Sequence, residues 1–144
     1  MTTLTLERRF AASPETVFAY ISRTEHLLKW WGPEGTTVPE HRLAFDKTGP
    51  WLSVMQNDEG QRFKVSGHVT HVDAPHSIGF TWAWHDENDM RGVESHVTIK
   101  LVPAVGGGTD FQLNHVDLPD SGSADNHQQG WTSSLRKLER LADA

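Results

Sequence analysis

Between Thr36 and Asp117 apolar and polar residues alternate, and short groups of turn-forming residues interrupt the alternation. A period of two is typical of β-strands with one buried face. The interruptions contain Gly, Pro, Asn and Asp, which favour tight turns. Short turns between consecutive strands predict an antiparallel meander. We place its six strands at Thr37–Phe45, Trp51–Gln56, Arg62–Val72, Ser77–His85, Val93–Val102 and Thr109–Val116.

The segment before this meander predicts one strand and two short helices. Thr3–Phe10 alternates as a strand with one solvated face. Ser13-Pro14 combines a helix N-cap with a first-turn proline. Thr24 can cap a second helix that ends at Trp30, because Gly32-Pro33 stops a helix.

The sequence closes with one long amphipathic helix. Its apolar positions Trp131, Leu135, Leu138 and Ala142 follow helical spacing. A sheet with one apolar face and a helix with one apolar stripe must bury these surfaces against each other. The order of elements therefore predicts a single α+β domain over residues 1–144.

Strand alternation also predicts which side chains face the final helix. The more apolar face of each strand contains Phe63, Val65, Val69 and His71; Ile78, Phe80, Trp82 and Trp84; Val93, Val97, Ile99 and Leu101; and Phe111, Leu113 and His115. On the strand after Gly49-Pro50, periodicity does not decide between Trp51, Ser53 and Met55 and the opposite face with Leu52 and Val54.

The inward set is rich in aromatic residues, and two interpretations are open. Each Phe or Trp buries roughly 150–250 Å², so the rings can simply fill a core. Ligand sites are also lined by aromatic groups with a few polar ones, here His71, His115 and His127. Trp30 and Trp31 are neighbours on a helix and point about 100° apart. We therefore expect one of them beneath the final helix and the other at the mouth of a cavity.

Composition and charge exclude several classes of function. A formal charge of -6 disfavours nucleic acid as a partner. No apolar run approaches the ~20 residues of a membrane span, and the first residues lack a signal-peptide pattern, so we expect a cytoplasmic protein without a membrane partner. Cysteine is absent. His68 and His71 fall on opposite faces of one strand, and we expect neither a metal nor a cofactor.

Motifs for nucleophilic catalysis are missing from the sequence. There is no Gly-x-Ser-x-Gly elbow, so we do not expect a hydrolase. His85–Asp89 lacks the pattern of a calcium loop and is typical of a solvated hairpin tip. The remaining catalytic possibility is general acid–base chemistry by a histidine, for which His115 is the first candidate and His71 the second. The competing interpretation is that each histidine is satisfied by a backbone partner or lies in water at the cavity mouth.

Five motifs in a fixed order run along nearly the whole chain: WWGPEG, FDKTGPW, GHVTHVDAPHSIGFTW, GGGTDFQLNH and HQQGWTSSLRKL. Together they resemble the activator of Hsp90 ATPase homologue family, within the START-like and Bet v 1-like (SRPBCC) superfamily. The resemblance implies a helix-grip fold, in which a strongly bent antiparallel sheet wraps a long C-terminal helix, two short helices follow the first strand, and a cavity lies between. Where the family usually has a basic residue and paired glycines, this chain has Asp46–Trp51.

The resemblance also implies a function. Family members commonly bind apolar small molecules, some relatives in the superfamily are cyclases or aromatases, and eukaryotic members assist Hsp90. We expect a monomer or homodimer that holds an apolar, partly aromatic ligand. The alternatives are a cyclase- or isomerase-type enzyme using His115 or His71, and a chaperone-associated or other protein-interaction module. The expected ligand-binding residues are Trp30, Trp31, Trp51, Met55, Phe63, Val65, Phe80, Trp82, Trp84, Val97, Ile99, Phe111, Leu113, His115, His127, Trp131 and Leu135.

Overall fold

The computed structural model describes residues 2–142, so residues 1, 143 and 144 of the expected domain lie outside the description. Its elements follow the expected order of strand, two helices, six strands and helix. They are β1 (Thr2–Phe10), α1 (Pro14–Ser22), α2 (Thr24–Trp30), β2 (Thr37–Arg42), β3 (Gly49–Gln56), β4 (Arg62–Asp73), β5 (Ser77–Trp84), β6 (Ser95–Pro103), β7 (Thr109–Leu118) and α3 (Ser121–Ala142).

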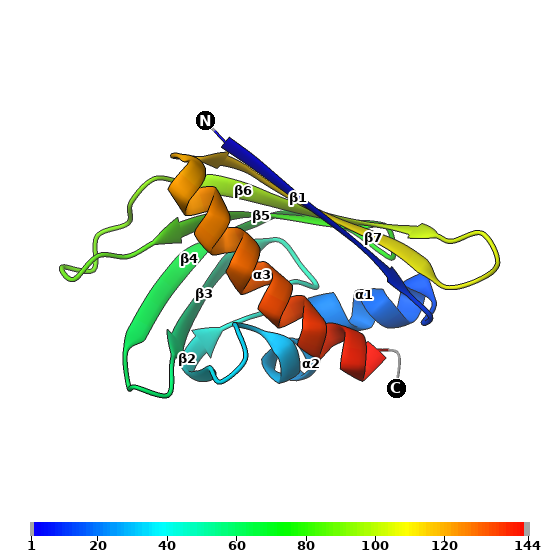
Figure 1. Ribbon diagram of the computed structural model, residues 1–144, viewed down its shortest axis with the longest axis horizontal. Helices are drawn as coiled ribbons and strands as arrows, with labels where there is room; N and C mark the ends of the chain where they lie inside the picture. Colours follow the sequence, from blue (N-terminus) through cyan, green and yellow to red (C-terminus); the bar gives the residue numbers. More distant parts are fainter. Residues whose placement is uncertain (1, 143–144) are drawn as a thin grey trace.

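Within residues 2–142, seven strands form one antiparallel sheet in the order β1-β7-β6-β5-β4-β3-β2. The first strand of the chain pairs with the last, and each remaining strand pairs with its neighbour in sequence. The sheet is strongly curved, and α3 lies diagonally across its concave face, with α1 and α2 beside the C-terminal end of α3 (Figure 1). This arrangement confirms the expected helix-grip fold.

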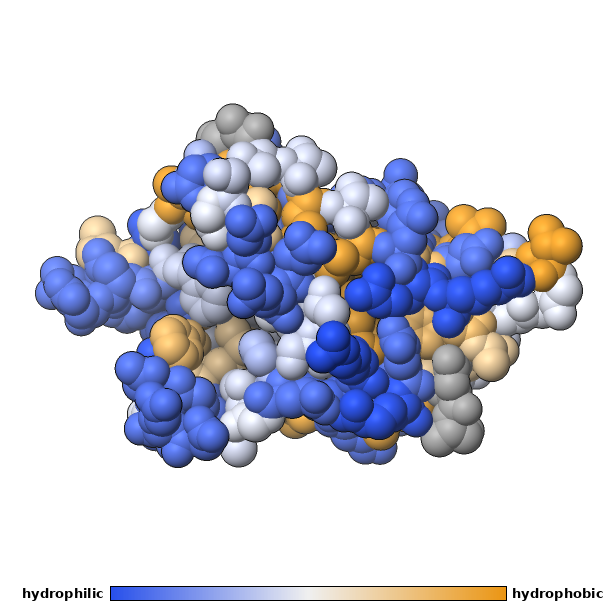
Figure 2. Space-filling view, viewed as in Figure 1, coloured by the Kyte–Doolittle hydropathy of each residue, from blue (hydrophilic) through white to orange (hydrophobic). Residues whose placement is uncertain are grey.

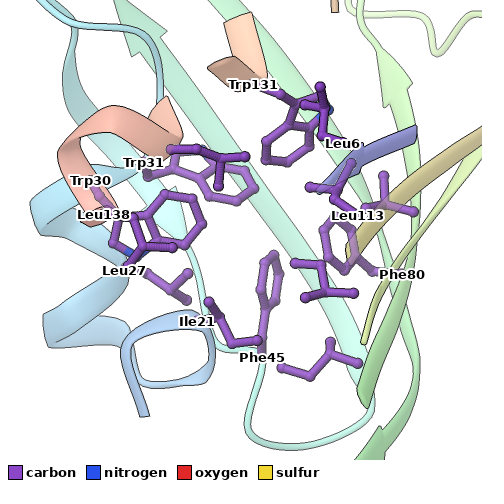
Figure 3. Close-up of a cluster of buried hydrophobic side chains, with 14 of the residues drawn as sticks. Leu6, Ile21, Leu27, Trp30, Trp31, Phe45, Phe80, Leu113, Trp131 and Leu138 are labelled. Atoms are coloured by element: carbon purple, nitrogen blue, oxygen red, sulfur yellow. The ribbon is translucent and has the colours of Figure 1, made fainter. Parts of the chain in front are cut away.

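The core fills the space between the concave face of the sheet and the three helices. Side chains from α1, α2, α3 and the strands point toward one another there (Figure 3). Periodicity did not decide which face of β3 is turned to the helix. In the structure it is the face with Trp51, Ser53 and Met55. Trp51 and Met55 belong to the core cluster, and Ser53 is fully buried beneath Trp31.

The two short helices begin differently from each other. The Ser13 hydroxyl accepts a bond from the Thr16 N–H over 3.3 Å, and Pro14 follows, as expected. The predicted cap at Thr24 is wrong: Arg23 occupies the N-cap position, and Thr24 is the first helical residue. The Thr24 hydroxyl instead donates to the carbonyl of Leu43, because a tertiary acceptor lies within its reach.

Strand β2 ends at Arg42 and not at Phe45 as predicted. Leu43 and Phe45 are only 1% exposed, and the Phe45 N–H bonds to the carbonyl of Ser22 over 3.0 Å. Both apolar residues pack into the core after the strand ends, and burial of their apolar surface favours this position.

Strand β6 starts at Ser95, so the predicted start at Val93 and its inward orientation are wrong. Val93 is 55% exposed. The preceding residues form a connection in which Arg91 makes an isolated bridge with His85 and an ion pair with Glu94. This connection keeps the chain outside the ladder until Ser95.

Two residues of β4 that were predicted to face inward, His71 and Phe63, do not do so. A register shift falls between Val69, which pairs with Phe80, and His71, which pairs with Gly79. The extra residue reverses the alternation, so His71 is exposed on the outer face and its ring lies over Gly79. Phe63 is 46% exposed because it lies at the end of the β3–β4 hairpin, which extends beyond α3 (Figure 1).

Candidate ligand-binding cavity

A cavity of about 750 Å³ lies between the first half of α3 and the concave face of the sheet. Pro33 and Gly32 of the α2–β2 connection close its lower rim, and β5 forms the back wall. Exposed residues of α3, including Asn126, border its opening. On the largely hydrophilic face seen in Figure 2, the surface is hollowed between α3 and the β3–β4 hairpin.

Six of the predicted ligand-binding residues line this cavity. Trp82 and Trp84 come from β5, and the others come from the end of α2, from β3 and from α3. The six are Trp31, Met55, Trp82, Trp84, His127 and Trp131. Trp82 is central to the wall, because its ring centroid lies 5.3 Å from that of Trp131 and 5.4 Å from that of Trp84.

The other predicted residues do not line the cavity. Nine are apolar side chains buried in the core: Trp30, Trp51, Val65, Phe80, Val97, Ile99, Phe111, Leu113 and Leu135. His115 is also fully buried, behind Trp131. Phe63 and His71 lie elsewhere on the surface, as described above. The alternation of side chains along the strands therefore predicted burial for most of these residues, but it could not distinguish residues of the cavity wall from residues of the core.

Trp31 lines the cavity and Trp30 does not, but both are buried in one core, at 1% and 2% exposure, so neither ring is exposed at the cavity mouth as expected. Trp30 is the last residue of α2, whereas Trp31 has extended backbone angles of -63° and 130°. Helical geometry therefore does not set the angle between the rings. Trp31 points from the end of α2 toward Trp131 (Figure 3), and its indole N–H bonds to the Ser53 hydroxyl over 2.9 Å.

His115 is held in a chain of hydrogen bonds behind the cavity wall. Nδ1 accepts from the Trp131 indole over 3.2 Å, so the neutral ring carries its proton on Nε2. That proton bonds to the Ser95 hydroxyl over 2.7 Å, and the hydroxyl donates to the carbonyl of Trp82 over 3.3 Å. Burial, and secondarily the charges of His127 and His96, lower the pKa of His115 to about 3. Both ring nitrogens are occupied and the ring is neutral near pH 7.

His127, on α3 one turn before Trp131, lines the cavity itself. Its Nε2 accepts from the Trp84 indole over 3.2 Å, and its ring centroid lies 4.5 Å from that of His115. Burial lowers the pKa of His127 as well. A ligand at this wall therefore meets a neutral imidazole whose proton is on Nδ1.

Sequence reasoning missed the small and polar part of the wall. These residues come from the α2–β2 connection, from the β7–α3 connection and from α3: Gly32, Pro33, Pro119, Asp120, Gly122, Ser123, Asn126, Gly130 and Ser134. A signal was present, because Gly122, Asn126, Gly130 and Ser134 recur every fourth residue and form one ridge of the helix. Small side chains along that ridge leave the space that the cavity occupies.

The rim formed by the α2–β2 connection is bonded to α3. The Glu34 N–H bonds to the Ser133 hydroxyl over 2.9 Å, and the Glu34 carboxylate forms an ion pair with Arg140. The hydrogen bond from Arg140 lowers the pKa of Glu34. Lys137 adds a long bond of 3.5 Å to the carbonyl of Pro33. These contacts hold the lower rim against the helix.

None of the helices in the described part of the chain is long and apolar enough to span a membrane. In the same part of the chain, no group of three or more acidic or histidine side chains is placed to hold a metal ion.

The curved sheet around α3 and the cavity beside the helix define a START-like helix-grip protein. A family model described as "Activator of Hsp90 ATPase homolog 1-like protein" matches residues 11–143, and the chain belongs to this family.

Solved structures agree with this assignment. An AHSA1 protein from Silicibacter pomeroyi is 53% identical, with a TM-score of 0.93 over 97% of this chain and 96% of that one. Proteins from Chromobacterium violaceum (24% identity, TM-score 0.87, 100% and 99% coverage) and Mycobacterium smegmatis (21%, 0.80, 99% and 91%) share the fold. No curated protein is significantly similar in sequence.

Proposed function

We propose that this protein binds a neutral, largely apolar small molecule with a flat ring system in the cavity beside α3. The observation that carries the proposal is a void of about 750 Å³ walled by Trp31, Trp82, Trp84, Trp131 and Met55. Sites for drug-sized ligands occupy roughly 300–1,000 Å³ and have such apolar walls with a few polar groups. Flat rings fit between tryptophan faces and edges in the same geometries that tryptophans adopt with one another.

The polar groups of the wall favour a ligand that carries a hydrogen-bond acceptor. The neutral ring of His127 in the wall carries its proton on Nδ1, because Nε2 accepts from the Trp84 indole. A ligand oxygen can accept a hydrogen bond from this N–H. Asp120 at the rim, the neutral ring of His127 and the formal charge of -6 disfavour an anion. A neutral aromatic ketone has the required chemistry.

Isothermal titration calorimetry with two probes of one skeleton tests this proposal. We expect 2-acetylnaphthalene, a neutral ketone, to bind more tightly than the anion 2-naphthoate. Gly130 gives a matched pair of variants, because a Cβ there lies 3.9 Å from Pro33 Cγ, an ordinary contact. Gly130→Leu should fill the cavity and abolish binding, whereas Gly130→Ala should bind as the natural chain does.

Two outcomes would overturn the proposal. Equal binding of the ketone by the natural chain and by Gly130→Leu would place the probe outside the cavity. Absence of binding by both probes, together with no copurified small molecule in native mass spectra, would argue against a ligand-binding role.

The two alternatives have less support. The enzyme alternative relied on His115, whose ring nitrogens are both occupied, and on His71, which lies on the outer face. The chaperone alternative rests on the family description alone. Stimulation of an Hsp90 ATPase by a protein that binds neither probe would favour it.

A further inference from the structure

A second cluster of polar side chains lies on the outer face of the sheet, away from α3 and the cavity. Ser66 on β4 follows the fully buried Val65, so its side chain points outward. It pairs with Ala83 of β5, and His85 follows two residues later with the same orientation. After the turn Arg91 returns beside His85 through the isolated bridge.

The side chains of this cluster form a continuous relay of hydrogen bonds. Ser66 Oγ lies 2.7 Å from His85 Nε2, and His85 Nδ1 lies 2.8 Å from Asp89 Oδ1. Arg91 Nε donates to Ser66 Oγ over 3.0 Å. Because the Asp89 carboxylate only accepts, His85 donates to it from Nδ1, and with the imidazole in this tautomer Nε2 accepts the Ser66 proton. Hydroxyl, imidazole and carboxylate in this order are the parts of an activated serine nucleophile.

The turn that carries Asp89 is ordered by its own bonds. Asp89 has a φ of 61°, a left-handed conformation that is uncommon outside glycine. Asp86 Oδ1 holds the turn by accepting from the backbone N–H groups of Asn88 and Met90 over 2.8 Å and 3.0 Å. Lys64 Nζ lies 3.0 Å from Asp89 Oδ1. The bond from Lys64, followed by that from His85, lowers the pKa of Asp89 and keeps the carboxylate ionised.

We propose that Ser66 is the nucleophile of an acyl-transfer site that accepts acyl groups from small activated esters. Ser66 Oγ forms a bond to the carbonyl carbon while His85 Nε2 takes the hydroxyl proton. The carbonyl π electrons move to its oxygen, where the Arg91 guanidinium supplies positive charge. When the oxyanion collapses, the bond to the alcohol oxygen breaks, and that oxygen leaves with the proton from His85.

Water then releases the acyl group. His85 takes a proton from the water as its oxygen bonds to the acyl carbon, the bond to Ser66 Oγ breaks, and Oγ regains a proton from His85. The products are a carboxylic acid and the restored serine. Asp89 does not contact the substrate and acts as a positioning residue, because it holds His85 in the tautomer that leaves Nε2 free to accept.

The test uses a fluorophosphonate, which phosphonylates an activated serine and releases fluoride, and 4-nitrophenyl acetate. We expect a single adduct on Ser66 by intact mass and peptide mapping, and release of 4-nitrophenolate. Ser66→Ala should lose the adduct, and His85→Gln should react at least ~100-fold more slowly, the usual contribution of a general base. Asp89→Asn should fold, because the carboxylate is 65% exposed and Asn tolerates a left-handed backbone.

Asp89→Asn also separates positioning from a structural role. In ¹⁵N spectra we expect His85 to be protonated on Nδ1 in the natural chain and to lose this preference in the variant, with slower labelling. The control is Ser77→Ala. Ser77 Oγ lies 3.0 Å from His71 Nε2 on the same face, and in the described part of the chain no carboxylate pairs with that ring. This variant should label like the natural chain.

Three results would overturn the proposal: unchanged labelling of Ser66→Ala, adducts spread over surface residues, or an Asp89→Asn variant with unchanged rate and tautomer. Gly130→Leu should leave labelling intact, so failure of this site and failure of the cavity are distinguishable.

Discussion

The indole Nε1 of Trp131 donates to Nδ1 of His115 over 3.2 Å and thereby sets the tautomer of a fully buried imidazole. This contact joins the long helix to β7 at the back of the cavity. Trp131 thus packs α3 against the sheet, lines the cavity and orients the imidazole of His115.

Trp131→Ala should lower the free energy of unfolding by ~3–5 kcal/mol, the usual range for emptying a large aromatic site. Trp131→Phe keeps most of the volume but leaves His115 Nδ1 without its donor, and should cost about 1–3 kcal/mol. Urea unfolding followed by circular dichroism measures both. A loss below about 1 kcal/mol for the alanine variant, within the range of surface sites, would contradict the anchoring role.

Stability should fall as the pH is lowered from neutral, because of His115. The unfolded chain binds a proton at the ordinary histidine pKa of 6.5, whereas burial lowers the pKa of folded His115 to about 3. Between these values protons bind preferentially to the unfolded chain, so the folded state loses about 1.4 kcal/mol for each pH unit through this group. Full stability from this group is present above pH 6.5.

Urea unfolding at several pH values checks this slope, and the His115 ring resonances should not titrate between pH 7 and 5. His115→Asn should flatten the dependence, whereas replacement of the exposed His68 by Asn should leave it as it is. An equal slope in both variants would assign the effect to other groups.

Gly130→Ala should stabilise the protein by about 0.5–1 kcal/mol. Glycine in the interior of a helix costs this amount relative to alanine, and the added Cβ makes only an ordinary contact, 3.9 Å from Pro33 Cγ. Thermal unfolding should show a higher Tm. A lower Tm would mean that the wall of the cavity does not tolerate even a methyl group.

Gly67→Ala, in contrast, should destabilise the protein. A Cβ at this position would lie 2.0 Å from the backbone oxygen of Thr81, which also accepts from the Trp51 indole over 3.1 Å. Relieving the clash requires movement of two strands, and overpacking of this kind costs roughly 1–3 kcal/mol. Gly92→Ala is the control, because its nearest atom, the oxygen of Trp84, lies at 3.6 Å. Equal Tm values for the two variants would refute the close approach.

Much of the fold could be predicted from local patterns. The cap at Ser13, the inward placement of Phe80 and Trp82 on β5 and the spacing of Trp131, Leu135 and Leu138 each depend on residues near one another in sequence, and the structure confirms them. The extra residue near Thr70 could not be predicted in this way, because the register of β4 is set by its partner β5. It moved His71, the second catalytic candidate, to the outer face.

The candidate sites depended more strongly on the tertiary structure. Strand and helix periodicity identified the aromatic residues that are buried, because burial of an apolar face follows from the repeat of the backbone. Separating wall from core required the position of α3 relative to the sheet, because the cavity lies beside the small residues Gly122, Gly130 and Ser134 of the helix. Ser66 and His85 come together only because β4 and β5 pair and the turn returns Asp89 toward them. Contacts between distant segments are properties of packing, and no local repeat encodes them.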